Sequence, residues 1–330
     1  MNDHAQSAKP QWHHTLNWGL LYNKYFLTSN PQNLAQIGKE TDTTRFFSLM
    51  CQGHLSTEQW NECTLLTVGK GADLIKIVRN TLQDDQHALS SVCQRYTHRQ
   101  CEMVKRLKGS DIQEQDAIKT VTCVWRFVNG LSMPHLMGVN LFWHPTLGIP
   151  YLPGSALKGI LKSFLMNTYP LNDAEKHDAD FIDFIRRVFG SDECPETSDT
   201  DHQTKNQAGD YIFFDALPTQ KMTFVTDVMT PHFGNWYQDG ATKTGQLNTT
   251  PNDWHDPVPI PFLALEDFEL QLAVLPRPGS TEKAPTGELA FITDMLCSAL
   301  SYQGAGAKSA VGYGYFEVSP RGSGKEHNLT

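Results

Sequence analysis

Hydrophobic residues recur first at helical spacing and later at strand spacing, which predicts a helical region followed by a mixed α and β arrangement. Residues 33–108 have a helical pattern, and one apolar face stands out within 85–109: Leu89, Val92, Tyr96, Met103 and Leu107. Gly109 and Ser110 supply the stop signal that ends this helix. Residues 1–30 hold several aromatic side chains and are expected to pack as an arm against the body.

Strand and helix patterns alternate after Lys119. Strands are predicted where β-branched and aromatic residues dominate, at residues 119–131, 210–218, 221–231, 262–276 and 312–318. Helices are predicted at residues 151–169, 178–190 and 286–302. Pro153 and Gly154 lead into the first of them with Ser155 as its N-cap, and Gly190 ends the second. The order strand, helix, strands, helix, strand predicts an α+β fold of the ferredoxin-like, split β-α-β kind.

Two stretches without hydrophobic period interrupt this order. Residues 191–208 are polar and acidic, whereas residues 230–260 combine aromatic side chains with Gly, Asn and Pro. Both are predicted to be insertions, and long excursions from a compact core are often functional. We therefore expect a helical N-terminal elaboration at 1–115, a core at 116–320 and a flexible tail at 321–330.

The composition is that of a globular chain that can bury a core. The 330 residues are 39% hydrophobic and 19% charged, without the run of about 18 apolar residues that a membrane span requires. The N-terminus lacks the apolar centre of a signal peptide. Seven scattered cysteines form no CxxC pair, which favours reduced thiols in a cytoplasm over disulfides or a zinc site. No cofactor or metal is expected.

The charge distribution is uneven. A net charge of −9 argues against a free-standing nucleic-acid binder, which would usually be basic. Between Ala117 and Asn172, however, there is no Asp or Glu, and four fixed cations lie in this window: Lys119, Arg126, Lys158 and Lys162. Such a window fits a surface that follows a phosphate backbone, and it also fits a buried strand and helix; charge alone leaves both open.

The segment SYQGAGAKSAVGYGYFEV, residues 301–318, has some features of a nucleotide-binding loop. That loop requires a glycine directly before the lysine and a helix after it, whereas here Ala307 precedes Lys308 and a strand follows. The remaining alternatives are a simple helix-to-strand connection and a backbone contact with RNA. The glycines, with one lysine and one serine, favour an anion-binding contact at Gly304, Gly306, Lys308, Ser309, Gly312 and Gly314.

A second candidate stretch is GIPYLPGSALKG, residues 148–159. Gly154 and Ser155 open a predicted helix, and Lys158 lies on its first turn, where free N–H groups and the helix dipole favour an anion. The alternative is a well-capped helix of the core.

Both stretches carry a family resemblance. IPYLPGSALKGILKSF resembles the I-P-G-S-S-L-K-G signature of the RAMP superfamily of CRISPR-associated proteins, with Ala156 where serine is often found. GAGAKSAVGYGYFEV resembles the C-terminal glycine-rich loop and last strand of that superfamily. LNWGLLYNKYF, GDYIFFDALP and VTDVMTPHFGNWY are similar to one family within it, the sixth subunit of the Cmr effector complex of type III-B CRISPR systems. The resemblance extends from Leu16 to Val318.

The resemblance implies an RRM-like RAMP domain in a cytoplasmic ribonucleoprotein of antiviral defence. It implies contacts with the guide RNA near its 3′ end, with target RNA, with other RAMP subunits and with a small helical subunit. In the excursion after Met229, His232 and Trp236 would stack on bases. The remaining expected RNA-binding residues are Arg126, Gly154, Ser155, Lys158, Lys162, Gly304, Gly306, Lys308, Ser309, Gly312 and Gly314.

Catalysis is not expected. RAMP subunits that cleave target RNA carry an aspartate in the loop after the first strand, whereas residues 129–148 contain no carboxylate to hold a metal. Asp215 and Asp227 fit turn capping or sheet-edge solvation better than a metal pair. One alternative is a metal-independent endoribonuclease that processes guide precursor, using His135 or His144 with Lys158. The other is a protein scaffold without RNA contact.

Overall fold

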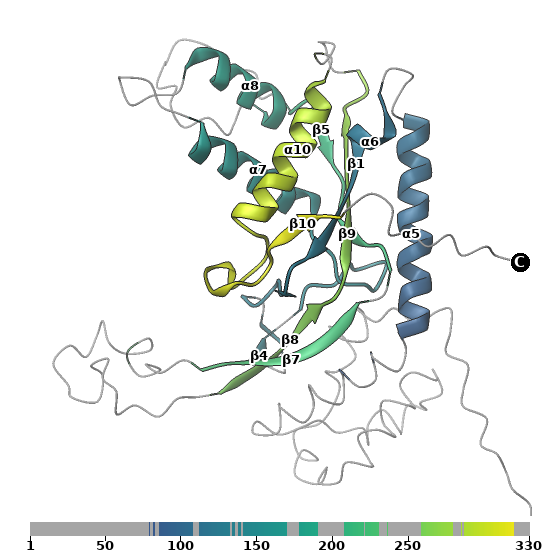
Figure 1. Ribbon diagram of the computed structural model, residues 1–330, viewed down its shortest axis with the longest axis vertical. Helices are drawn as coiled ribbons and strands as arrows, with labels where there is room; N and C mark the ends of the chain where they lie inside the picture. Colours follow the sequence, from purple (N-terminus) through teal and green to yellow (C-terminus); the bar gives the residue numbers. More distant parts are fainter. Residues whose placement is uncertain are drawn as a thin grey trace, which may run out of the picture. The chain divides into compact units, whose positions relative to one another are not determined.

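The computed structural model describes residues 79, 82, 86–107, 112–132, 134–135, 138–139, 141–169, 178–190, 208–220, 222–230, 236, 259–279, 285 and 287–319 (Figure 1). Contacts divide the chain into two units. The first contains Met1–Ala88, Gly130–Gly148 and Phe224–Ala264; the second contains Leu89–Asn129, Ile149–Thr223 and Leu265–Thr330. The predictions for the N-terminal arm, the helical pattern before residue 79, most of both insertions and the tail lie outside the described residues.

The second unit contains a five-stranded sheet in the order β10-β1-β9-β5, with β6 also paired to β9. All of these pairs are antiparallel. In the centre of the sheet, Val121 faces Leu270 on one side and Val318 on the other. The strands are β1 (Ile118–Cys123), β5 (Tyr211–Phe213), β6 (Leu217–Pro218), β9 (Glu269–Pro276) and β10 (Phe316–Val318). The predicted mixed α and β class is therefore confirmed.

Two helices pack together on one face of this sheet. α7 (Gly154–Thr168) contacts α10 (Glu288–Tyr302), and α10 contacts β1, β9 and β10 (Figure 1). Their apolar faces are buried at Leu157, Leu161, Leu165, Leu289, Ile292, Leu296 and Leu300. The short helix α6 (Glu114–Ala117) leads into β1, and α8 (Ala179–Phe189) packs beside α7. As predicted, α8 ends at Gly190, whose φ of 100° is in the left-handed region.

The helix α5 (Gln86–Leu107) is present as predicted, but a different face of it is buried. The buried residues are Leu89, Cys93, Thr97, Gln100 and Val104, whereas Leu107 is exposed. The reason is polar: Gln271 of β9 donates to the Thr97 carbonyl at 3.2 Å and to Gln100 Oε1 at 2.7 Å. Hydrophobic spacing alone cannot predict a buried helix face that includes two polar residues, Thr97 and Gln100. Figure 1 shows α5 on the side of the sheet away from α10.

Two predicted strands are each divided in the structure. Residues 119–131 form β1 and then β2 (Arg126–Phe127), which pairs with the end of β8 (Ile260–Glu266) in a second sheet that also contains β7 (Thr223–Met229). The single strand predicted at 262–276 is wrong, because Asp267 has a φ of 52° and separates β8 from β9.

In the first unit, β3 (Pro134–His135) and β4 (Gly138–Val139) form a two-stranded sheet. The rings of Trp143 and Phe224 stack there at 5.9 Å. None of the helices in the described part of the chain has the length and apolar character needed to cross a bilayer.

Buried thiols give the second unit a defined response to alkaline pH. Burial raises the pKa of Cys93 and Cys123 to about 12 and that of Cys297 to about 11, from an ordinary value of 9.0. Above pH 9 the unfolded chain has lost these protons and the folded chain has kept them, so stability falls as pH rises. Between pH 8 and pH 10, we expect the free energy of unfolding measured in urea to fall by about 4 kcal/mol from the three thiols.

The control is Cys297→Ala, which removes one of the three groups. Its fall over the same pH interval should be smaller by about a third, whatever its stability at pH 8. An equal fall in the variant and the wild type would contradict this assignment.

Candidate nucleic-acid interface

The glycine-rich loop comprises residues 303–315, between α10 and β10, and it turns repeatedly through the left-handed region. Positive φ angles occur at Gly304 (72°), Gly306 (84°), Lys308 (61°), Gly312 (97°) and Gly314 (74°). A short 3-10 turn, η5 (Ser309–Val311), lies at its tip. A lysine with positive φ is uncommon, so the loop holds Lys308 in a conformation that a free chain rarely adopts.

The base of the loop lies directly against the backbone of β2. The Gly314 N–H donates to the Arg126 carbonyl at 2.6 Å, and the Ala307 N–H donates to the Val128 carbonyl at 2.7 Å. A Cβ on Gly306 would overlap the Val128 carbonyl oxygen, and one on Gly314 would overlap that of Ala305. These two glycines are therefore needed for the close approach itself, apart from any contact with RNA.

The tip of the loop presents backbone and charge. Gly306 and Ala310 are exposed, and their N–H groups have no acceptor within the part of the chain that the structure describes. The Lys308 ammonium lies 5.8 Å from the centre of the Tyr313 ring, and the Lys308 carbonyl accepts from Val311 and Tyr313 at 3.1 and 3.3 Å. Backbone donors beside a fixed cation form a surface that suits an anion.

The start of α7 has a different arrangement from the predicted one. Pro153 is the N-cap and makes no side-chain capping bond, so the prediction of Ser155 as N-cap is wrong. Instead, the Gly154 N–H donates to Asp215 Oδ1 at 2.8 Å, and Ser155 is exposed one residue later. Asp215 therefore caps the start of a helix, a role that differs from the turn capping or sheet-edge solvation expected for it. The helix dipole favours an anion at the start of α7, and the Asp215 carboxylate, rather than a phosphate, occupies this position.

Three cations of the acid-free window, Lys119, Arg126 and Lys158, bind groups from elsewhere in the chain. Lys119 pairs with Asp294 at 2.7 Å and Arg126 with Glu266 at 3.3 Å. The Lys158 ammonium donates to the Phe189 carbonyl at 2.8 Å, at the end of α8. A window without acids in the sequence is thus not without acids in space, and its positive field is weaker than the sequence indicates.

The contact of Lys158 gives a prediction that separates a structural role from RNA binding. Lys158→Met keeps the aliphatic stem and removes the donor to α8, so the free energy of unfolding should fall by about 1 kcal/mol in urea titrations without RNA. Arg95→Met, at an exposed position of α5, should change it by less than about 0.5 kcal/mol. Equal stability of the Lys158 variant and the wild type would show that the hydrogen bond from the Lys158 ammonium does not stabilise the fold.

A buried hydrogen bond connects the two candidate stretches. Asn129 is buried, and its amide donates to the Tyr151 carbonyl at 2.7 Å, two residues before Pro153. The neighbouring Val128 carbonyl accepts a hydrogen bond from the Ala307 N–H of the loop. Residues 128–129 therefore connect the loop to the segment that precedes α7. Of the predicted stacking residues, Trp236 is exposed in the first unit, and His232 lies outside the described residues.

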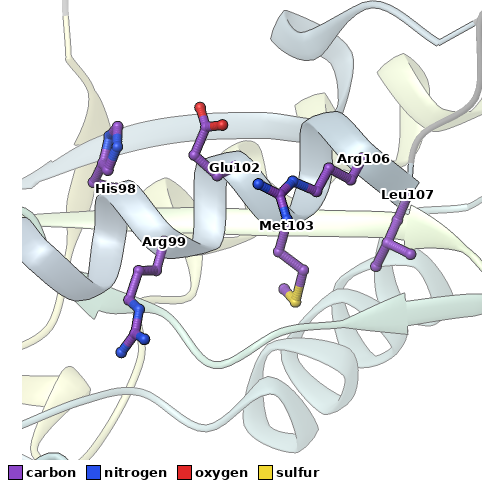
Figure 2. Close-up of a pocket in the computed structure, with 6 residues that line it drawn as sticks. All are labelled: His98, Arg99, Glu102, Met103, Arg106 and Leu107. Atoms are coloured by element: carbon purple, nitrogen blue, oxygen red, sulfur yellow. The ribbon is translucent and has the colours of Figure 1, made fainter.

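One helix carries a second basic surface. An open hollow of about 500 Å³ is lined by α5 alone among the described residues: His98, Arg99, Glu102, Met103, Arg106 and Leu107 (Figure 2). The Arg99 guanidinium lies 5.9 Å from the Tyr96 ring centre, and Lys105 pairs with Glu102 at 3.2 Å. Figure 2 shows His98 and Glu102 on one side of the helix and Arg99 and Met103 on the other, so these side chains do not converge on one point and the glycine-rich loop is the better candidate site.

Sequence reasoning missed Trp125, which it treated as an interior strand residue. In the structure it is exposed beside Tyr313 of the loop, with ring centres 4.9 Å apart. The available signal was the run Cys123–Val124–Trp125, which breaks the alternation of inward and outward positions.

The chain is similar in sequence to two curated proteins. Cmr6 of the CRISPR Cmr system from Pyrococcus furiosus is 30% identical over 57% of this chain and 64% of its own length. Cmr6 from Saccharolobus solfataricus is 26% identical over 54% of this chain and 49% of its own. Each match thus covers less than two thirds of the relative.

A structure of type III-B Cmr-β bound to cognate target RNA contains a chain that is 19% identical, with a TM-score of 0.49, covering 92% of this chain and 95% of that one. The family model of the RAMP superfamily matches residues 68–317, which include α7, α10, the strands from β1 to β9 and the glycine-rich loop. The chain therefore belongs to the RAMP superfamily and is similar to the Cmr6 subunits.

Proposed function

We propose that the chain is a non-catalytic, RNA-binding structural subunit of a type III-B CRISPR (Cmr) ribonucleoprotein. In this role it holds the 3′ region of the guide RNA, helps to capture target RNA, and contacts other RAMP subunits and a small helical subunit. The observation that carries the proposal is the glycine-rich loop, in which the exposed residues Gly306 and Ala310 lie on either side of Lys308 along the chain. Membership of the superfamily and the similarity to Cmr6 support it.

We also infer that the core is ferredoxin-like. The order β10-β1-β9-β5 with antiparallel neighbours supports this, as do the helices α7 and α10, which follow β1 and β9 along the chain. Two elements are elaborations of that plan: the helix α5, and the second sheet that β2 joins.

The non-catalytic role is supported by the state of the alternative acid–base residues. His144 Nδ1 accepts from the N–H groups of Thr146 and Leu147 at 3.3 and 3.2 Å, so this nitrogen stabilises a turn. The Lys158 ammonium is bonded to the Phe189 carbonyl. While Nδ1 accepts these hydrogen bonds, the neutral ring carries its proton on Nε2, so His144 has no free lone pair to act as a general base, and Lys158 would have to leave Phe189 to reach a leaving group.

Co-expression with the other Cmr subunits and a guide RNA tests the proposal. We expect the chain to enter the purified complex together with guide RNA and the complex to lose guide retention when the loop is altered. Exclusion of the wild-type chain from the complex would contradict the proposal. Cleavage of guide precursor by the chain alone, abolished by His144→Ala, would support the endonuclease instead.

Lys308 is expected to contribute one phosphate contact. Lys308→Gln keeps a polar side chain, one atom shorter, but removes the charge, so the affinity of the complex for guide should fall and the slope of log affinity against log salt should decrease by about one. Lys105→Gln, on α5, is the control and should leave the slope unchanged. An unchanged slope in the Lys308 variant would show that backbone groups alone hold the guide.

A further inference from the structure

Trp125 lies at a fixed bend between two strands. β1 ends at Cys123 and β2 begins at Arg126, and the two residues between them are exposed, Val124 at 57% and Trp125 at 47%. The bend is held from both sides, because the Val124 N–H donates to the Tyr315 carbonyl at 2.9 Å and the Arg126 carbonyl accepts from Gly314. A large exposed ring on a backbone held in this way is positioned before any ligand arrives.

The surroundings of the indole combine aromatic rings with positive charge. The Tyr313 ring lies 4.9 Å away at an angle of 57°, and the Arg126 guanidinium carbon lies 5.0 Å from the indole centre. Lys308 lies over Tyr313 on the same loop. A Cβ at Gly312 would contact the indole at 3.7 Å, so the absence of a side chain there leaves that edge uncovered.

These features favour a nucleic-acid base over a protein side chain as the occupant. Exposed apolar residues at the loop, Val124, Trp125 and Val311, mark a binding surface. Lys308 lies over Tyr313, where it complements the phosphates that accompany a stacked base, whereas Arg126 is already paired with Glu266 at 3.3 Å. The surface is also continuous with the backbone of the glycine-rich loop, through the Gly314 and Arg126 hydrogen bond.

We propose that Trp125 is a stacking platform for one unpaired base of a single-stranded RNA whose phosphates follow the glycine-rich loop. The proposal rests on the proposed RNA-binding function and adds the class of ligand: an unpaired nucleotide, since a base inside a duplex cannot offer its face to an indole.

Photocrosslinking in the assembled complex tests this proposal. Guide RNA carries 5-iodouridine at one position at a time, and trypsin releases residues 120–126, which contain Trp125, separately from residues 309–321 of the loop. We expect one position to label peptide 120–126 and neighbouring positions to label peptide 309–321. Labelling of the loop peptide alone would overturn the stacking proposal and leave the proposed function standing. Labelling of neither peptide would overturn both.

Variants separate stacking from folding. Trp125→Phe keeps a ring and should retain the crosslink and the affinity of the complex for guide, whereas Trp125→Ala should lower that affinity by about 5- to 100-fold. Phe291→Ala, on α10, removes an aromatic side chain that is also 47% exposed and should leave affinity unchanged. Wild-type RNA affinity in Trp125→Ala, with loss of a neighbouring subunit from the complex, would make this a protein-docking surface and overturn the proposal.

Discussion

Alanine in place of Gly314 is expected to lower the free energy of unfolding by about 3 kcal/mol or more and to release the glycine-rich loop from β2. The φ of 74° disfavours any side chain, which costs about 1–2 kcal/mol. The added Cβ would also overlap the Ala305 carbonyl oxygen, so the hydrogen bond from the Ala305 N–H to the Gly314 carbonyl and the one from the Gly314 N–H to the Arg126 carbonyl would both be disturbed. Urea unfolding of the purified variant measures the loss, and guide retention by the complex should fall with it.

A matched glycine separates strain from overlap. Gly279 has a φ of 80°, but a Cβ there would meet nothing within 4 Å. Gly279→Ala should therefore lower the free energy of unfolding by about 1–2 kcal/mol, from the strain of the positive φ alone. If the two variants lost equal stability, the close approach of the loop to its own backbone would not be what requires glycine at 314.

Glutamine in place of Glu288 is the second substitution with a large expected effect. The Glu288 carboxylate is buried at the start of α10, is bonded to both terminal nitrogens of Arg187 at 2.5 Å, and accepts from the Tyr211 hydroxyl at 2.7 Å. Burial and the hydrogen bond to Glu288 also raise the pKa of Tyr211 above its ordinary value. Removal of the charge leaves the guanidinium unpaired, so the free energy of unfolding should fall by about 3 kcal/mol in urea.

Asp294→Asn is the control for that substitution. Asp294 pairs with Lys119 at 2.7 Å, but its side chain is 61% exposed, so loss of this pair should change the free energy of unfolding by less than about 1 kcal/mol. Similar effects of the two variants would mean that Arg187 and Glu288 do not join α8 to α10 in the way their geometry indicates.

Hydrophobic spacing predicted the helices well because most of their buried faces are apolar. α7, α8 and α10 each bury leucine, isoleucine or phenylalanine at helical intervals, and local pattern was sufficient for them. Hydrophobic spacing failed where a polar interaction or a backbone conformation determines which face is buried or where a strand ends. Thr97 and Gln100 turn α5 toward Gln271, and Asp267 takes up a left-handed conformation inside an otherwise continuous apolar run.

The candidate site was predictable in its segments but not in its chemistry. The sequence indicates that residues 303–315 form a glycine-rich connection, and it predicts that Gly306 and Lys308 belong to an anion-binding contact. It cannot show that Asp215 occupies the start of α7 or that Phe189 holds Lys158, because these partners lie 61 and 31 residues away along the chain. The exposure of Trp125 follows from a bend between two sheets, which is likewise a tertiary feature.

A ribonuclease footprint of the guide shows whether the chain holds the 3′ region of the RNA. Complexes assembled with the wild-type chain, without the chain, or with Gly314→Ala are digested, and the protected guide nucleotides are mapped. We expect that omission of the chain exposes the 3′ region of the guide alone, and that Gly314→Ala exposes part of the same region. Unchanged protection of the 3′ region without the chain, or loss of protection confined to the 5′ region, would contradict this expectation.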